Sequence, residues 1–196
     1  FSKAPTEAEV GTLAVGETRD VPISLVLAQD ALASHAEHGP AILTLNLTYV
    51  VDDFEVRQSR TRALVVYGRS ALSWDKVDSI AAFVTPRGGA VATTARAALG
   101  AIPDELRGQA TAYPAALVTT LASLGLRYVK DPVAPFGSES IDFVQAPGDT
   151  LNRGAGDCDD LAVLVAALAE SAGIAALIWV TPDHVLVGLE AGVPSQ

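Results

Sequence analysis

A run of nine apolar residues, "LAVLVAALA" at positions 161–169, constrains the fold of this 196-residue chain more than any other feature. In a helix such a run is apolar on every side, and a helix of that kind is buried all round. It is far shorter than the roughly 18 residues that a membrane-spanning helix needs. We therefore expect a helix that runs through the centre of a domain and ends at Gly173.

Composition and net charge indicate which classes of binding partner the chain can have. Hydrophobic residues make up 49% of the chain, which is enough for a substantial core. The formal net charge of −10 disfavours nucleic acid and anionic membrane surfaces, since both attract basic proteins. We expect no nucleic-acid partner and no membrane insertion. The single cysteine excludes an intrachain disulfide and a zinc site built on two thiolates.

The first third of the chain has the pattern of antiparallel strands. Residues 11–28 contain two short strand candidates, and residues 41–50 alternate between leucines and polar residues. A turn at 52–55 and a returning strand at 61–68 complete a hairpin. We expect residues 1–69 to form a β-rich N-terminal segment with sandwich-like strands.

The pattern changes to helices after Gly68. Apolar residues at helical spacing come first and predict three helices. A long irregular stretch then leads to the apolar helix, and two strands joined by a tight turn follow it. The expected helices are 73–85, 90–100 and 111–126, the irregular stretch is 130–156, and the strands are 174–180 and 185–190. The fold class is thus α+β, with a central helix packed on an antiparallel sheet.

The only cysteine, Cys158, precedes the apolar run and stands between Asp157 and Asp159, with Asp160 next. A helix N-terminus favours a thiolate, whereas neighbouring carboxylates oppose it. Asp157 suits the N-cap, and acidic residues are favoured in a first helical turn. Capping is the preferred explanation for the three aspartates, and a calcium site formed by them is the alternative.

A nucleophilic thiol needs a base, and His184 lies 26 residues after Cys158, at the start of the last expected strand. A central helix of roughly 22 Å, followed by a strand returning beside it, brings both residues to one edge of the domain. Catalytic roles for Cys158 and His184 are therefore the working hypothesis. Tyr128 and Trp179 are candidates either for the wall of a cleft or for the core.

The segment "GDCDDLAVLVAALAESAGI…TPDHVLVGLE" resembles the core of the transglutaminase-like superfamily of papain-type cysteine enzymes. In that family the cysteine begins the central helix in a "GDCxDLA…LLxxxGI" motif, and the histidine opens a strand after a "PGHV"-like turn. The upstream "PGDTLNRGAGDC" is similar to the bacterial branch. Asp183 stands where the family more often has glycine. The resemblance covers residues 70–190 in order and is densest over 147–190.

The resemblance implies a papain-like core over residues 70–196 and a Cys–His–Asp triad. Cys158 would attack a carbonyl group and His184 would carry the proton. Glu190 is too far along the strand from His184, at roughly 20 Å, and Asp183 points to the opposite face. The third residue is therefore expected outside this chain, or it is absent altogether, and the domain is expected to be truncated at its C-terminus.

The activity implied is thiol-dependent acyl transfer, above all hydrolysis of a peptide or amide bond in a protein or peptide substrate. No cofactor is required by such chemistry, and the bacterial relatives suggest the periplasm or cell envelope. A non-catalytic binding or assembly module that keeps Cys158 and His184 is the alternative function.

Overall fold

The structure, a computed structural model, describes residues 1–131 and 141–190. Helices and strands both occur, which confirms the α+β class. The chain divides into two compact units, residues 1–69 and 70–196, and the change of sequence pattern after Gly68 lies at this boundary.

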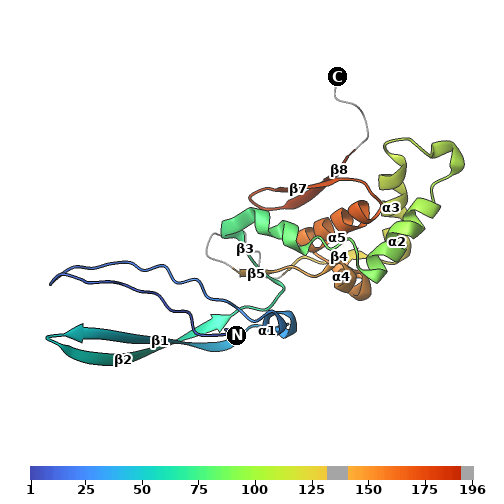
Figure 1. Ribbon diagram of the computed structural model, residues 1–196. Coiled ribbons are helices and arrows are strands. Elements are labelled where there is room, and N and C mark those ends of the chain that lie inside the picture. The colour runs from blue at the N-terminus through green and yellow to red at the C-terminus, as the bar shows by residue number, and fades with distance from the viewer. Residues whose placement is uncertain (132–140, 191–196) are drawn as a thin grey trace, which may run out of the picture. The chain divides into compact units, whose positions relative to one another are not determined.

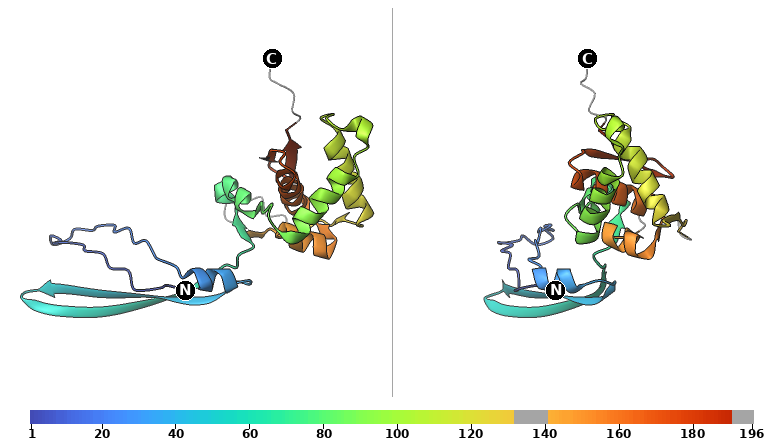
Figure 2. Two further views of the ribbon diagram at one scale, coloured as in Figure 1. Left: turned by 45° about the vertical axis from the view of Figure 1, so that its right-hand side comes forward. Right: turned by 90° about the vertical axis from the view of Figure 1, so that its right-hand side faces the viewer.

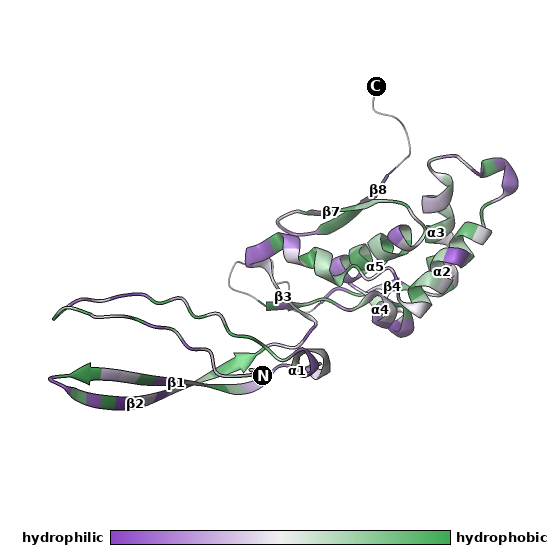
Figure 3. Ribbon diagram, viewed as in Figure 1, coloured by the Kyte–Doolittle hydropathy of each residue, from purple (hydrophilic) through white to green (hydrophobic). Residues whose placement is uncertain are grey.

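The first unit is built on a long antiparallel hairpin of β1 (Gly39–Val51) and β2 (Phe54–Val66). Asp52 and Asp53 form its turn with φ values of 49° and 65°, as a type I′ hairpin turn requires. Because this turn takes only two residues, both strands are longer than expected. Apolar and polar residues alternate along them (Figure 3).

The two strands predicted within residues 11–28 are wrong. This segment has no strand, and its one ladder contact is an isolated bridge between Ser2 and Leu27. A short helix, α1 (Gln29–Ser34), follows it. In the part of the unit that the structure describes, β1 and β2 form the whole sheet, so a second sheet of a sandwich is not present there.

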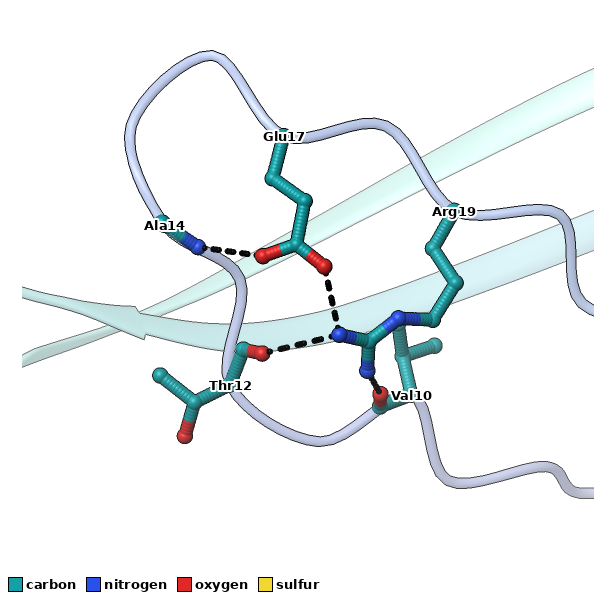
Figure 4. A network of polar contacts seen from close by, with 5 residues as sticks. All are labelled: Val10, Thr12, Ala14, Glu17 and Arg19. Atoms are coloured by element: carbon teal, nitrogen blue, oxygen red, sulfur yellow. Dashed lines mark hydrogen bonds and ion pairs between the residues drawn. The ribbon is translucent and has the colours of Figure 1, made fainter.

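In the first part of this segment, side chains bond the backbone (Figure 4). The Arg19 guanidinium donates to the carbonyl of Val10 at 2.6 Å and to that of Thr12 at 3.4 Å, and it pairs with Glu17 at 2.6 Å. Glu17 in turn accepts the N–H of Ala14 at 2.9 Å. Backbone groups engaged in this way are not arranged for strand pairing, which accounts for the absence of the first of the two predicted strands. At the end of the segment, Val26 and Ala28 form backbone hydrogen bonds with Lys3 and Phe1.

The second unit contains most of the helices and several short strands. Its helical elements are η1 (Trp74–Phe83), α2 (Gly89–Gly100), η2 (Asp104–Leu106), α3 (Ala112–Ser123), α4 (Pro147–Arg153) and α5 (Cys158–Ser171). Its strands are β3 (Ala71–Ser73), β4 (Arg127–Tyr128), β5 (Ile141–Phe143), β6 (Ala155–Gly156), β7 (Ala176–Val180) and β8 (Val185–Leu189).

Two sequence predictions need correction in this unit. The helix expected at 73–85 is the 3₁₀ helix η1, which is kinked where Lys76 leaves helical geometry. The stretch 130–156, expected to be irregular, contains β5, α4 and β6. Tertiary pairing explains the two strands, since each is only two or three residues long and pairs with a distant strand. Residues 132–140 of this stretch lie outside the described residues.

Helix α5 is the centre of the second unit, as its apolar run predicts. From Ala162 to Ala169 every residue is buried except the half-buried Val165. The antiparallel hairpin of β7 and β8 packs on one side of α5, and α4 lies on the other (Figures 1 and 2). Figure 3 shows apolar residues along both α5 and β7. The end of α5 that begins with Cys158 is therefore held by a packed core.

Among the described residues, no helix combines the length and the apolarity needed to cross a membrane.

The core role of α5 gives the first prediction. The side chain of Leu168, a residue of α5, is fully buried in the core that α5 forms with α2 and α3. We expect Leu168→Ala to lower the free energy of unfolding by about 2–5 kcal/mol, through lost burial and a cavity. Urea unfolding followed by circular dichroism measures this. Val118→Ala in α3 is the control, because Val118 is 68% exposed and its loss should change stability by no more than about 0.5 kcal/mol.

Candidate functional site

The chain approaches Cys158 through a tight backbone passage. Helix α4 ends at Gly154 in the left-handed conformation, with φ of 65°. Strand β6 then pairs in parallel with β4 and leads to Asp157. A Cβ atom at Gly156 would lie 2.7 Å from the Cβ of Asp160. Glycine is therefore required at 156, because the first turn of α5 packs directly on this backbone.

Asp157 is the N-cap of α5, as the sequence predicted. Its side chain accepts the backbone N–H of Asp160 at 3.4 Å. The same N–H also lies 3.0 Å from Oδ1 of Asp159. Asp159 and Asp160 are in the first helical turn but are only 2% and 5% exposed. These carboxylates are thus inside the unit rather than on its surface, which capping alone does not predict.

The Asp160 carboxylate is bonded chiefly by Gln145, and the backbone N–H of Asp157 also donates to it. The backbone N–H of Gln145 donates to Oδ1 of Asp160 at 2.7 Å, and the Gln145 side-chain amide donates to Oδ2. Burial raises the pKa of Asp160, and these two bonds from Gln145 oppose the rise. Asp160 therefore ties the first turn of α5 to the segment that follows β5.

A third buried carboxylate, Asp142, lies on β5. Its Oδ2 accepts the indole N–H of Trp74 at 2.9 Å. Sequence reasoning missed both Asp142 and Gln145, because they lie in the stretch expected to be irregular. The one available signal was the position of Asp142 between apolar neighbours in "IDFV", which is unusual for a solvated loop.

The structure brings Cys158 to the start of β8. The Cys158 side chain is partly buried, and the backbone N–H groups of Val185 and Asp159 donate to its sulfur. Burial raises the pKa of the Cys158 thiol, and the negative charges of Asp157 and Asp159 raise it further. The two N–H groups lower it, but less than burial raises it. The free thiol is therefore mostly protonated at neutral pH.

His184 is the residue before Val185, so its backbone is adjacent to the thiol, as expected. Its carbonyl accepts the backbone N–H and the hydroxyl of Thr181, both at 2.8 Å, which closes the β7–β8 turn. The imidazole itself is exposed, and it forms no hydrogen bond within the described residues. The structure thus places the His184 backbone beside Cys158, and the ring forms no hydrogen bond to the sulfur in the described residues.

Neither of the two acidic residues considered as the third triad member forms a hydrogen bond with His184 in the described residues. Asp183 is exposed, and its Oδ1 accepts the Thr181 hydroxyl at 3.3 Å. Glu190 is exposed at the far end of β8, where its N–H donates to the carbonyl of Ala175 at 2.9 Å. Neither carboxylate is hydrogen-bonded to His184 in the described part of the chain.

Asp159 has the most perturbed carboxyl group of the site. Burial raises its pKa from 3.8 to about 9, and contact with the carboxyl group of Asp157 is the next cause. Two carboxylates have no hydrogen-bond donor between them, so their contact is attractive only when a proton or a cation lies there.

A group of three residues at this point could hold a metal ion. Ligand atoms of Asp157, Cys158 and Asp159 lie within 4.8 Å of one another. Asp160, which was expected in a calcium site with Asp157 and Asp159, is bound to Gln145 instead, and Cys158 takes its place in the group.

Neither of the two candidate aromatic residues belongs to the core. Trp179 is 55% exposed on β7, between the inward-facing Ile178 and Val180. Tyr128 is 54% exposed and ends the short strand β4. Partial desolvation raises the pKa of the Tyr128 phenol, and the charges of Cys158 and Asp157 contribute to the rise. Tyr128 is therefore near the thiol, whereas Trp179 is on the face of the hairpin away from α5.

A cavity of about 510 Å³ lies at the opposite end of α5 from Cys158. It is lined by Pro86, Arg87, Ala92, Arg96, Glu170 and Ser171. None of the residues discussed above contributes to it.

No family model, no curated protein and no solved structure matches this chain.

The carboxylates beside the thiol give a second prediction. We expect iodoacetamide to alkylate Cys158 with an apparent pKa above the ordinary cysteine value of about 8.5. Asp157→Asn removes one negative charge and keeps an N-cap, so it should lower the thiol pKa and accelerate alkylation at pH 7.5. Asp149→Asn, which changes an exposed aspartate in α4, is the matched control and should leave the rate unchanged. An equal effect of both variants would contradict this electrostatic account.

A third prediction concerns the pH dependence of stability. Between about pH 4 and pH 9 the folded protein holds a proton on Asp159 that the unfolded chain has lost, so stability falls as pH rises. Asparagine does not titrate, so Asp159→Asn removes this fall in stability with rising pH. We expect the variant to gain stability relative to wild type by up to about 1.4 kcal/mol per pH unit.

Urea unfolding at pH 5, 6, 7 and 8, with EDTA present, measures the difference. If the stability curves of wild type and Asp159→Asn run parallel across this range, the raised pKa of Asp159 is wrong.

Proposed function

We propose that residues 70–196 carry a thiol-dependent acyl-transfer site that hydrolyses a peptide or amide bond. Cys158 is the nucleophile and His184 is the base. The observation that carries the proposal is the bond from the Val185 N–H to the Cys158 sulfur, one residue after His184. The packing of α5 against β7 and β8 also fits the transglutaminase-like core that the sequence resemblance implies.

The reach of His184 supports this assignment. One residue of extended chain spans about 3.3 Å, so the Cα of His184 lies within a side-chain length of the sulfur. Its carbonyl is fixed by Thr181, and its exposed ring is free to change rotamer without disturbing the core. Catalytic hydrogen bonds are often open in free enzymes and tighten when substrate binds.

The reaction follows from these two groups. The imidazole takes the thiol proton as the sulfur attacks the carbonyl carbon, and the protonated ring then gives this proton to the leaving amine as the C–N bond breaks. Water next attacks the thioester. The imidazole removes a proton from the water, and the C–S bond breaks to release the acid and regenerate the thiol.

The raised pKa of Cys158 sets a condition on this mechanism. A mostly protonated thiol is a weak nucleophile, so proton transfer to His184 must accompany the attack. The proposed substrate is accordingly a protein or peptide whose binding brings the imidazole to the sulfur.

The alternative is a non-catalytic module, and two observations favour it. The His184 imidazole forms no hydrogen bond to the thiol in the described residues, and burial raises the pKa of the Cys158 thiol, which disfavours its ionised form. In such a module Cys158 would serve as a small packed residue at the start of α5.

A calcium ion at the aspartates is a further candidate property. Asp157 and Asp159 belong to the metal-capable group and their oxygens suit a hard cation, but Asp160 is bound to Gln145, so the group offers fewer oxygens than the six to eight that calcium prefers. If calcium binds there, it should raise the melting temperature and EDTA should lower it.

The fourth prediction tests the acyl-transfer proposal. We expect the protein to cleave members of a mixed peptide library, followed by mass spectrometry, and Cys158→Ala to abolish the cleavage. His184→Ala should also lower cleavage by at least about 100-fold, because the base is lost. His38→Ala changes an exposed histidine of the first unit and is the control.

Circular dichroism should show that all three variants remain folded. Cleavage that persists in Cys158→Ala would refute the mechanism. Absence of cleavage by the wild-type protein, with the library bound intact, would establish the module instead.

A further inference from the structure

A buried oxygen of Asp159 lacks a partner. The residue is 2% exposed, and its Oδ1 lies 3.0 Å from the N–H of Asp160. Its Oδ2 is buried and accepts no hydrogen bond in the described part of the chain. An ionised oxygen in such a place is costly unless a proton or a cation satisfies it.

The same carboxylate faces two further metal ligands. Ligand atoms of Asp157, Cys158 and Asp159 lie within 4.8 Å of one another. Ligands about 2.0–2.3 Å from a common tetrahedral cation lie roughly 3.5 Å apart. A closure of about 1 Å, within the range of small side-chain rotations, would therefore bring the three atoms around one ion.

The charge around the group is not balanced by cationic side chains. In the described ranges, the salt bridges join Arg19 to Glu17, Arg57 to Glu55 and Arg107 to Asp104. None of them involves the carboxylates at the start of α5. Asp160 is turned to Gln145, so it leaves the group with three ligands.

We propose that Asp157, Cys158 and Asp159 bind one divalent cation of the zinc class and that this cation blocks the thiol. A thiolate is a soft ligand, and zinc accepts a mixed set of sulfur and carboxylate oxygen with four ligands in all. Calcium needs six to eight oxygens, which this group does not supply. Asp157 and Cys158 are half-buried, so solvent can supply the fourth ligand.

Binding exchanges protons for the metal ion without any redox step. The cation forms a bond to the Cys158 sulfur and displaces the thiol proton to solvent, together with any proton held between the two carboxyl groups. Donation of a sulfur lone pair to the cation withdraws electron density from the sulfur, so the bound thiolate is a weaker nucleophile toward a carbonyl group or an alkylating agent than a free thiolate. The bound cation and the free thiol are therefore alternative states of one site.

The fifth prediction uses cobalt(II) as a spectroscopic probe of the site. Protein without a histidine tag is freed of metal by a chelator and titrated with Co²⁺. We expect a thiolate-to-cobalt charge-transfer band that saturates at one ion per chain. Cys158 is the only cysteine, so such a band can arise from no other residue. Zn²⁺ should displace the cobalt, release protons into a weak buffer and slow iodoacetamide alkylation of Cys158 at least tenfold.

Variants assign the ligands. Cys158→Ser should abolish the band, and Asp159→Asn and Asp157→Asn should each weaken binding at least tenfold, with folding checked by circular dichroism. Asp149→Asn is the matched control and should bind as wild type does. A large excess of Ca²⁺ should not displace the cobalt.

Three results would overturn the proposal. They are the absence of a stoichiometric charge-transfer band, wild-type affinity in both Asp157→Asn and Asp159→Asn, and displacement of cobalt by calcium. None of these readouts uses turnover, so the outcome is separate from that of the acyl-transfer test.

Discussion

The second unit depends on how the N-terminus of a central, largely buried helix is satisfied. From Ala162 to Ala169 helix α5 is apolar and buried except at the half-buried Val165, and Asp159 and Asp160 of its first turn lie inside the unit as well. The free N–H groups of that turn then need partners that water cannot provide. Asp157 and Asp159 both accept one of them, the N–H of Asp160, and the N–H of Asp159 donates to the Cys158 sulfur. Asp160 is drawn inside as well. The bonds from Gln145 to Asp160 explain how that carboxylate is tolerated there, because two donors replace its lost hydration.

This solution has a chemical consequence for Cys158. The helix N-terminus that favours a thiolate is already engaged by aspartates, and burial adds a larger penalty for a charged sulfur. The position that looks activated in the sequence is therefore not activated in the free protein. Any nucleophilic role requires a second event, either the arrival of the His184 imidazole or a change in charge at Asp157 and Asp159.

The parts of this arrangement that follow local rules could be predicted from the sequence. The apolar run fixed the central helix, Asp157 was recognisable as its N-cap, and the Cys158–His184 spacing indicated that the helix start meets the last strand. Long-range polar pairing could not be predicted. The bonds of Gln145 to Asp160 and of Trp74 to Asp142 join residues 15 and 68 positions apart, and neither pattern nor propensity encodes them. The first failed strand of residues 11–28 has a more local origin, since Arg19 bonds backbone carbonyls at Val10 and Thr12.

The contact between Asp157 and Asp159 requires one positive charge, whatever supplies it. A proton satisfies it and leaves the sulfur as a neutral thiol. A divalent cation satisfies it as well, but it also takes the sulfur as a ligand. Approach of a protonated imidazole at His184 would offset the same negative charge from the side of β8 and favour a thiolate. The aspartates thus do more than cap α5, because the cation that balances them determines whether the single thiol of the chain is dormant, bound or reactive.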